Sequence, residues 1–217
     1  MNRYLSLALS ETTPGTGKFN LIAMDMDRYE LVPLSLQKSE IITPGGEIFW
    51  DLGRMTAVGK SDKCTEKRTD PRNVSVKPQE CHLLPDSVNL RGLLEENLSD
   101  ATQFFMDHSP ENRFAIVKAS KVVEIRSGHS KYDGTLKCRM KLQLKGLNET
   151  SQLLNKDYRW VKYWQWHDEN GTLENQEEIS SRYCRLLNDG KKNVYLILYR
   201  HFFTKGDMVW IAGIHWL

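Results

Sequence analysis

The sequence predicts a mainly β protein with a few helices, in which a helical connector joins two small barrel-like halves. Both ends of the chain hold short segments in which apolar and polar residues alternate, as they do in half-buried strands. A leucine-rich segment in the middle has helical spacing instead. With 217 residues the chain is long enough for two small domains. We therefore expect a first barrel at residues 1–87, the connector at 88–112 and a second barrel at 113–217.

The first barrel is expected to open with a hairpin. Leu5, Leu7 and Leu9 alternate with smaller or polar neighbours, which is the period-two pattern of a strand with one buried face. The turn-forming segment 14–17 (PGTG) follows, and a second strand is expected at 19–26. Further short strands are expected at 29–34, 48–52 and 54–58.

A long basic loop is expected at residues 59–77 within the first barrel. It holds six Lys or Arg residues against three Asp or Glu residues, so its local excess of positive charge exceeds the net charge of +2 of the whole chain. Charged surface loops are commonly just solvated. The alternative is that Lys67, Arg68 and Arg72 contact nucleic acid, and the sequence leaves both interpretations open.

The connector is expected to be helical. Four leucines recur at intervals of three and four residues between Leu90 and Leu98, which places them on one face of a helix. A second short helix is expected at 100–106, and Ser109–Pro110 marks its end.

The clearest pattern in the chain lies in the second barrel. From Leu136 to Lys145, apolar residues alternate strictly with basic or amide residues, which predicts a strand with one face on a core and the other in solvent. The solvent face would carry a row of cations about 7 Å apart, because a strand rises about 3.3 Å per residue. The cations of this face, with two from a neighbouring segment, are the candidate nucleic-acid contacts Lys137, Arg139, Lys141, Lys145, Lys121 and Arg126.

An aromatic segment follows at residues 158–167 (YRWVKYWQWH). If it is extended, Trp160, Lys162, Trp164 and Trp166 share one face and could form a platform on which bases stack. Alternatively, the tryptophans belong to the core, where buried aromatic residues dominate small β proteins. After this segment we expect an inserted helix at about 174–188 and a closing hairpin with strands at 194–202 and 208–216.

The composition favours a cytoplasmic protein that binds rather than catalyses. The sequence contains no apolar run of about 20 residues that would span a bilayer, and its N-terminal segment has no signal-peptide pattern. The four cysteines form no CxxC pair, so we expect free thiols, no metal and no cofactor. No phosphate loop, dinucleotide fingerprint, HExxH motif or nucleophile elbow is present. Asp25 and Asp27 are the one candidate carboxylate pair for a metal-dependent nuclease.

Several segments, in this order, resemble one known family. They are the opening LALSETTPGTGKFNLIAMD, then LVPLS, the mid-chain NLRGLLEENL, FAIVKASKVVEIRS, and the closing VYLILYRHFF and MVWIAGIHWL. This layout is similar to the dual OB-fold domain of bacterial and phage-related conflict and mobile-element proteins. The resemblance covers nearly the whole chain and lies in the order and hydrophobic pattern of the segments. It implies two OB-like barrels and binding to nucleic acid.

The chain departs from that family in its first half. The family has basic residues in the first turn and an Arg before the Pro of the third strand. This sequence has Glu11-Thr12-Thr13-Pro14 in the turn, and Val32 before Pro33. The resemblance therefore implies that any contact with nucleic acid has moved to the second half.

Taken together, these features predict a nucleic-acid-binding accessory protein of an anti-phage defence or mobile-element system. Its ligand would be single-stranded DNA or RNA, because small OB barrels combine a cationic groove with aromatic stacking platforms. The alternative is a protein-interaction or scaffold subunit of a larger complex, whose interface would include Trp210, Ile214 and Trp216. A metal-dependent nuclease is a third hypothesis, and no membrane partner is expected.

Overall fold

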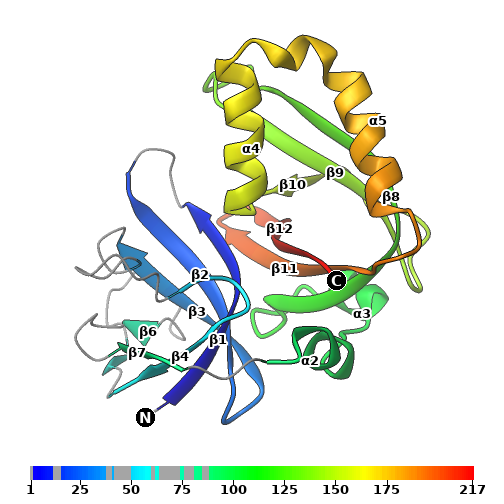
Figure 1. The fold of residues 1–217 in the computed structure, drawn as a ribbon. Coiled ribbons are helices and arrows are strands. Elements are labelled where there is room, and N and C mark those ends of the chain that lie inside the picture. Colours follow the sequence, from blue (N-terminus) through cyan, green and yellow to red (C-terminus); the bar gives the residue numbers. More distant parts are fainter. Residues whose placement is uncertain are drawn as a thin grey trace. The chain divides into compact units, whose positions relative to one another are not determined.

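The computed structural model describes residues 2–11, 16–37, 41, 50–59, 62–63, 74–75, 81–84 and 88–217. The chain divides into two compact units, Met1–Leu93 and Leu94–Leu217. Most of the regular structure in the described residues is strand, which confirms the prediction of a mainly β fold with a few helices (Figure 1). None of the helices in this described part has the length and apolar character that crossing a membrane requires.

The first unit is a single sheet of short strands. Its elements are β1 (Asn2–Glu11), β2 (Lys18–Asp25), β3 (Glu30–Gln37), β4 (Met55–Val58), β5 (Asp62–Lys63), β6 (Val74–Ser75) and β7 (Cys81–Leu83). They pair in the order β5-β6-β3-β2-β1-β4-β7. The expected loop at 59–77 is wrong at β5 and β6, because these residues pair with each other. The expected strand at 48–52 is also wrong where it is described, since residues 50–52 form a turn.

Two short helices lie in the chain between the strands of the first unit and those of the second. They are α2 (Leu90–Glu96) and α3 (Ala101–Met106), close to the predicted ranges. The boundary between the two compact units falls inside α2. The Asp100 side chain caps α3 by accepting a hydrogen bond from the Gln103 backbone at 2.9 Å. Ser99 exchanges hydrogen bonds with Ile116, so the α2–α3 segment is attached to the first strand of the second unit.

The second unit is a closed five-stranded barrel. Its strands are β8 (Phe114–His129), β9 (Leu136–Leu144), β10 (Leu153–Asn155), β11 (Val194–Phe203) and β12 (Gly206–Trp216). They pair in the order β10-β12-β11-β8-β9, and β9 also pairs with β10 to close the ring. β10 and β12 are parallel, whereas the other neighbours are antiparallel. Counted from β8 as strand 1, this is the cycle 1-2-3-5-4-1 of an OB-fold barrel.

The described pairings of the first unit follow the same cycle. β1, β2 and β3 form a meander, β4 pairs with β1, and β6 runs parallel to β3. β4 pairs with β7, with Val58 opposite Cys81, and β5 pairs with β6, with Asp62 opposite Ser75. Both pairings are antiparallel, and their registers are nearly the same. β4 with β5 therefore corresponds to strand 4 of the cycle, and β6 with β7 to strand 5. Both units are OB-like.

The second unit inserts helices between its third and fourth strands. They are α4 (Tyr158–Glu169), η2 (Thr172–Asn175) and α5 (Gln176–Leu187). Together they pass over the far part of β8 and β9, and we call them the arch (Figure 1). α5 is the helix predicted at about 174–188. The possibility of an extended aromatic segment at 158–167 is wrong, because these residues form α4. The Asp157 carboxylate caps this helix by accepting from the Arg159 backbone at 2.9 Å.

The core of the second unit fills the barrel and extends beneath the helices. Strand residues that point inward, such as Met140, Leu142 and Leu198, pack with Trp164 of α4 and Leu187 of α5. β8 is the longest strand of the second unit, with 16 residues. Bulges between Ala119 and Lys121 and between Val122 and Glu124 bend it, so that one continuous strand serves both the barrel and the arch.

Candidate nucleic-acid interface

The alternation predicted for residues 136–145 is present in β9. Cys138, Met140 and Leu142 are buried in the core, whereas Arg139 is exposed and Lys137 is partly exposed on the opposite face. The outward side chains of β9 therefore form a row on the outside of the barrel, as an alternating strand requires.

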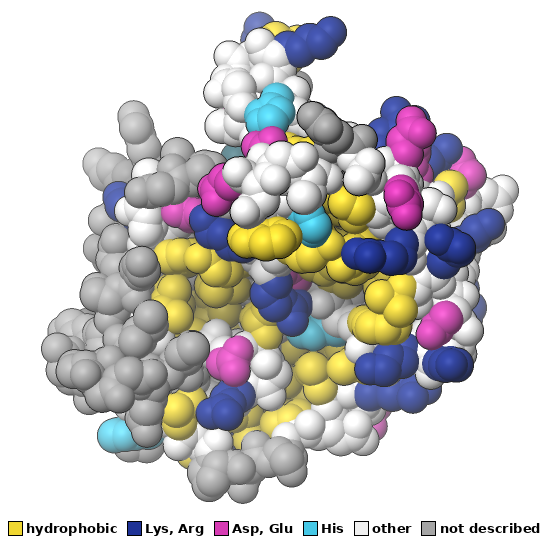
Figure 2. All heavy atoms as spheres, turned by 45° about the horizontal axis from the view of Figure 1, so that its top comes forward, with side chains coloured by type: hydrophobic (Ala, Val, Ile, Leu, Met, Phe, Trp, Pro, Cys, Tyr) yellow, Lys and Arg dark blue, Asp and Glu magenta, His cyan; other side chains and the backbone are white. Residues whose placement is uncertain are grey.

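Acidic partners neutralise much of this row. Asp133 accepts from Lys137 at 3.2 Å, Glu149 pairs with Lys141, and Glu124 pairs with Arg126. On the face of the molecule in Figure 2, dark blue cations lie among magenta carboxylates rather than in one continuous patch. The sequence pattern could not reveal these pairs, because Glu124 and Glu149 come from segments outside the alternating strand.

Three of the six candidate cations on and around β8 and β9 form no ion pair with any described residue. They are Arg139, Lys121 and Lys145, and all three are exposed. Arg139 lies near the middle of β9, next to β10, whereas Lys121 lies at a bulge of β8 and Lys145 beyond the end of β9. The structure thus separates Arg139 from the other two.

Arg139 belongs to a continuous row of outward side chains that crosses all five strands. It lies opposite Arg126 of β8 on one side and Leu154 of β10 on the other. Leu154 lies opposite Trp210 of β12, and Trp210 opposite Tyr199 of β11. Tyr199 in turn lies opposite Phe114 at the start of β8, and their rings stack at 5.3 Å. Because neighbouring strands are about 4.8 Å apart, Arg139 and Tyr199 are separated by about 14 Å across the sheet.

The aromatic half of this row continues along β11 and β12. The His201 ring stacks on Trp210 with centroids 4.8 Å apart and planes inclined by 10°. Phe203 packs edge-on against His201 at 4.5 Å and is 52% exposed. We call Tyr199, His201, Phe203 and Trp210 the aromatic face.

Cations border the aromatic face closely. The Lys156 ammonium lies 3.8 Å from the centre of the Trp210 ring. Burial, and then the charge of Lys137, lowers the pKa of the Lys156 ammonium. Burial, and then the charges of Lys156 and Arg113, lowers the pKa of His201 below its ordinary value of 6.5. The surface therefore combines ring faces with positive charges close to them.

The sequence did not lead us to predict the aromatic face as a nucleic-acid contact, although a signal was present and Trp210 was expected at a protein interface. Tyr199, His201 and Phe203 occupy alternate positions of YRHFF, which puts all three on one side of a strand. Lys156 and Trp210 carried no such signal, because the contact between them depends on the parallel pairing of β10 with β12.

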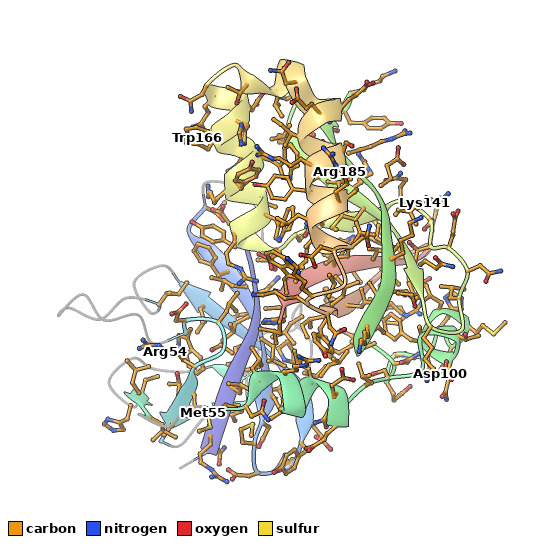
Figure 3. The ribbon with its side chains drawn as sticks, turned by 45° about the vertical axis from the view of Figure 1, so that its right-hand side comes forward. Arg54, Met55, Asp100, Lys141, Trp166 and Arg185 are labelled. Carbon is orange, nitrogen blue, oxygen red and sulfur yellow. The ribbon has the colours of Figure 1, made fainter. Side chains whose placement is uncertain are left out.

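The predicted aromatic platform on residues 158–167 does not form, because a helix distributes these side chains around its axis. Trp164 is fully buried, and Trp160 packs edge-on against Tyr183 of α5 at 5.5 Å. Lys162 is exposed and lies over the Tyr158 ring at 5.5 Å. Trp166 points outward with 57% exposure near the end of α4 that leads into η2 (Figure 3). Trp160 and Trp164 thus help to pack the arch.

The remaining candidates lie in the first unit. Lys67, Arg68 and Arg72 are outside the described residues. The Asp27 carboxylate binds Arg3 at 2.7 Å, and this bond lowers its pKa, while Asp25 accepts from the Asp27 backbone at 2.9 Å.

No metal site or disulfide involves the described residues. Among them, no group of three or more His, Cys, Asp or Glu side chains could hold a metal ion. Cys81, Cys138 and Cys184 are free thiols. Cys64 is outside the described residues.

Comparison with known proteins identifies no family for this chain. No protein-family model and no curated protein matches the chain. One similar solved structure is a replication protein A heterotrimer bound to single-stranded DNA, with a TM-score of 0.45 and 10% identity over 99% of this chain and 47% of that chain. This chain thus spans about half the length of that protein. Another is the tetrameric p202 HIN2, with a TM-score of 0.42 and 5% identity over 99% of this chain and 90% of that chain.

Proposed function

We propose that the second barrel binds single-stranded nucleic acid across the outer surfaces of β9, β10, β12 and β11. The observation that carries the proposal is the cross-strand row, in which Arg139 and the aromatic face are joined through Leu154. A single strand needs ring faces for its bases and positive charges for its phosphates. This row supplies both within about 14 Å.

Bases would stack first on the most open ring of the aromatic face. Phe203 is half exposed, whereas Trp210 has His201 on one side and the Lys156 ammonium against its ring. A cation over an aromatic ring contributes about 0.5–2 kcal/mol, and a stacked base about 1–3 kcal/mol. A base can therefore replace Lys156 on Trp210, and the displaced ammonium is then close enough to approach a phosphate.

Two matched pairs of variants test the proposal in anisotropy titrations with labelled oligothymidylate and oligouridylate. Phe203→Ala should weaken binding roughly 5- to 150-fold, the cost of one stacked base. Trp166→Ala is its control, because Trp166 is exposed to a similar degree but lies on α4. Arg139→Ala should lower the slope of log K against log salt by about 0.7, whereas Lys162→Ala should not.

The titrations have outcomes that reject the proposal. Absence of binding at low salt to both DNA and RNA oligonucleotides would reject it outright. If one stoichiometric protein were then recovered from a pull-down, the role would be that of a scaffold subunit. If Trp166→Ala weakened binding as much as Phe203→Ala, the ligand would lie over the arch instead of the aromatic face.

We also propose that the chain is a divergent member of the dual OB-fold family and serves a bacterial or phage defence or mobile-element system. Support comes from the OB-like strand cycle of both units together with the order of the segments that resemble the family. Deleting the gene in its host should change the efficiency of plating of at least one phage or the transfer of a mobile element. Unchanged values for both would contradict this role.

A further inference from the structure

A second group of cations gathers where α5 meets β8, away from the aromatic face. Asn188 ends α5, and its side-chain amide binds the Val122 backbone twice, donating to the carbonyl and accepting from the N–H, each at 2.8 Å. Lys121 precedes Val122, and Arg185 lies three residues before Asn188 on α5, where Figure 3 labels it. The paired hydrogen bonds therefore join the end of α5, which carries Arg185, to the part of β8 that carries Lys121.

Two lysines in the turn after α5 join this group. The Asp189 carboxylate accepts from the Lys191 backbone at 2.9 Å and shapes the turn. Lys192 extends over the Trp216 ring at 4.8 Å. The chain then enters β11, whose first residue Val194 pairs with Ala119 of β8, two residues before Lys121. We call Lys121, Arg185, Lys191 and Lys192 the α5–β8 junction.

The junction concentrates positive charge. Its four cations are exposed, and none forms an ion pair with a described residue. Asp189 is the single acidic side chain in the segment from Arg185 to Val194, which holds three cations, so this segment has a local excess of two positive charges. A helix C-terminus favours a cation in its last turn, which accounts for Arg185. It does not account for the other three, which lie outside the helix.

The junction and the row are separate surfaces, and β8 contributes residues to both. Lys121 lies opposite Gln143 and Arg126 opposite Arg139, which are four residues apart on β9, so the two cations are separated by about 13 Å along the sheet. Between them, Glu124 pairs with Arg126, and the neighbouring Lys141 on β9 pairs with Glu149. A neutralised stretch thus separates two areas that carry unpaired cations.

We propose that the α5–β8 junction is a second contact for the phosphates of the strand that the aromatic face holds. This inference rests on the proposed function. A strand that is long enough to pass the neutralised stretch reaches the junction, whereas a short oligonucleotide occupies the row alone. The junction therefore sets how much the protein gains in affinity as the ligand is lengthened.

The test compares oligothymidylates of about 4 and about 16 nucleotides, the range of OB-fold site sizes. The double variant Arg185→Ala with Lys191→Ala removes two junction cations and leaves Lys192 on Trp216. It should bind the short oligonucleotide like the wild type and the long one roughly ten-fold more weakly, with a salt slope lower by about 1.4. The control removes Lys162 and Arg91, two exposed cations outside both the row and the junction, and should bind both lengths like the wild type.

The outcomes separate this inference from the proposed function. If the wild type bound neither length, the proposed function would fail. If the wild type bound both and the junction variant bound the long oligonucleotide equally tightly, only the junction would be refuted. Vesicles with anionic lipid provide a third arm: loss of vesicle binding in the junction variant, with oligonucleotide binding intact, would overturn the assignment in favour of a membrane surface. Circular dichroism of the variants confirms that they are folded.

Discussion

Asp157 offers the sharpest test of how the candidate site is held, because it directly follows Lys156 and is itself held by several hydrogen bonds. Its side chain is fully buried and accepts hydrogen bonds from the Ile214 backbone at 2.8 Å, from the Arg159 backbone at 2.9 Å and from the Arg159 guanidinium at 2.8 Å. It thereby ties the start of α4 to β12, the strand that carries Trp210. We expect Asp157→Ala to destabilise the second unit strongly.

The magnitude follows from two losses. Removing a helix cap costs about 0.5–2 kcal/mol, and leaving the buried Ile214 N–H without a partner costs about 1–3 kcal/mol. The free energy of unfolding should therefore fall by about 3 kcal/mol. Asp100→Ala is the matched control, because Asp100 caps α3 through one hydrogen bond at an exposed position. Its loss should be about 1 kcal/mol.

Urea denaturation followed by tryptophan fluorescence measures both variants. The midpoint of Asp157→Ala should lie clearly below that of Asp100→Ala at an unchanged slope. Equal losses for the two variants would refute the reasoning, because they would mean that the buried hydrogen bonds between α4 and β12 add nothing to the cap.

Three further outcomes follow from single residues. The pKa of the His201 imidazole lies below 6.5 in the folded chain. The contribution of the neutral His201 side chain to stability is therefore complete above about pH 6.5 and is lost as the pH falls below it. An NMR titration that gives a pKa of 6.5 or higher contradicts this. Asn188→Ala should cost about 1–3 kcal/mol of unfolding free energy because the backbone N–H and carbonyl of the buried Val122 each lose a partner, whereas Asn170→Ala at the exposed end of α4 should cost under about 1 kcal/mol by the same denaturation assay. Burial raises the pKa of Cys138 to about 12, so peptide mapping should find it alkylated at pH 8 only after unfolding.

The strands were predictable wherever one local pattern determines the outcome. In β9 every second residue from Leu136 to Leu144 is apolar, and such alternation is compatible with a single buried face. The same reasoning fails for residues 158–167, where aromatic residues are frequent enough to satisfy a strand or a helix. The Asp157 cap and the burial of Trp164 between barrel and arch select the helix, and neither can be inferred from the segment itself.

The candidate site was harder to predict, because it is assembled from strands that are distant in sequence. Arg139 could be identified from its own strand. Its connection to Trp210 requires β10 to pair with β9 on one side and in parallel with β12 on the other. Sequence patterns specify which face of a strand is buried, but they do not specify which strands become neighbours.

The carboxylates of Glu124 and Glu149 compete with any anionic ligand for the cations on the outer face of β8 and β9. Any polyanion that approaches Arg126 or Lys141 must first displace a carboxylate that is already in place. A ligand that offers only charge, such as heparin, exchanges one ion pair for another and gains little, whereas a ligand with bases also gains the ring contacts. Discrimination between nucleic acid and other polyanions would then come from the acidic residues as much as from the basic ones.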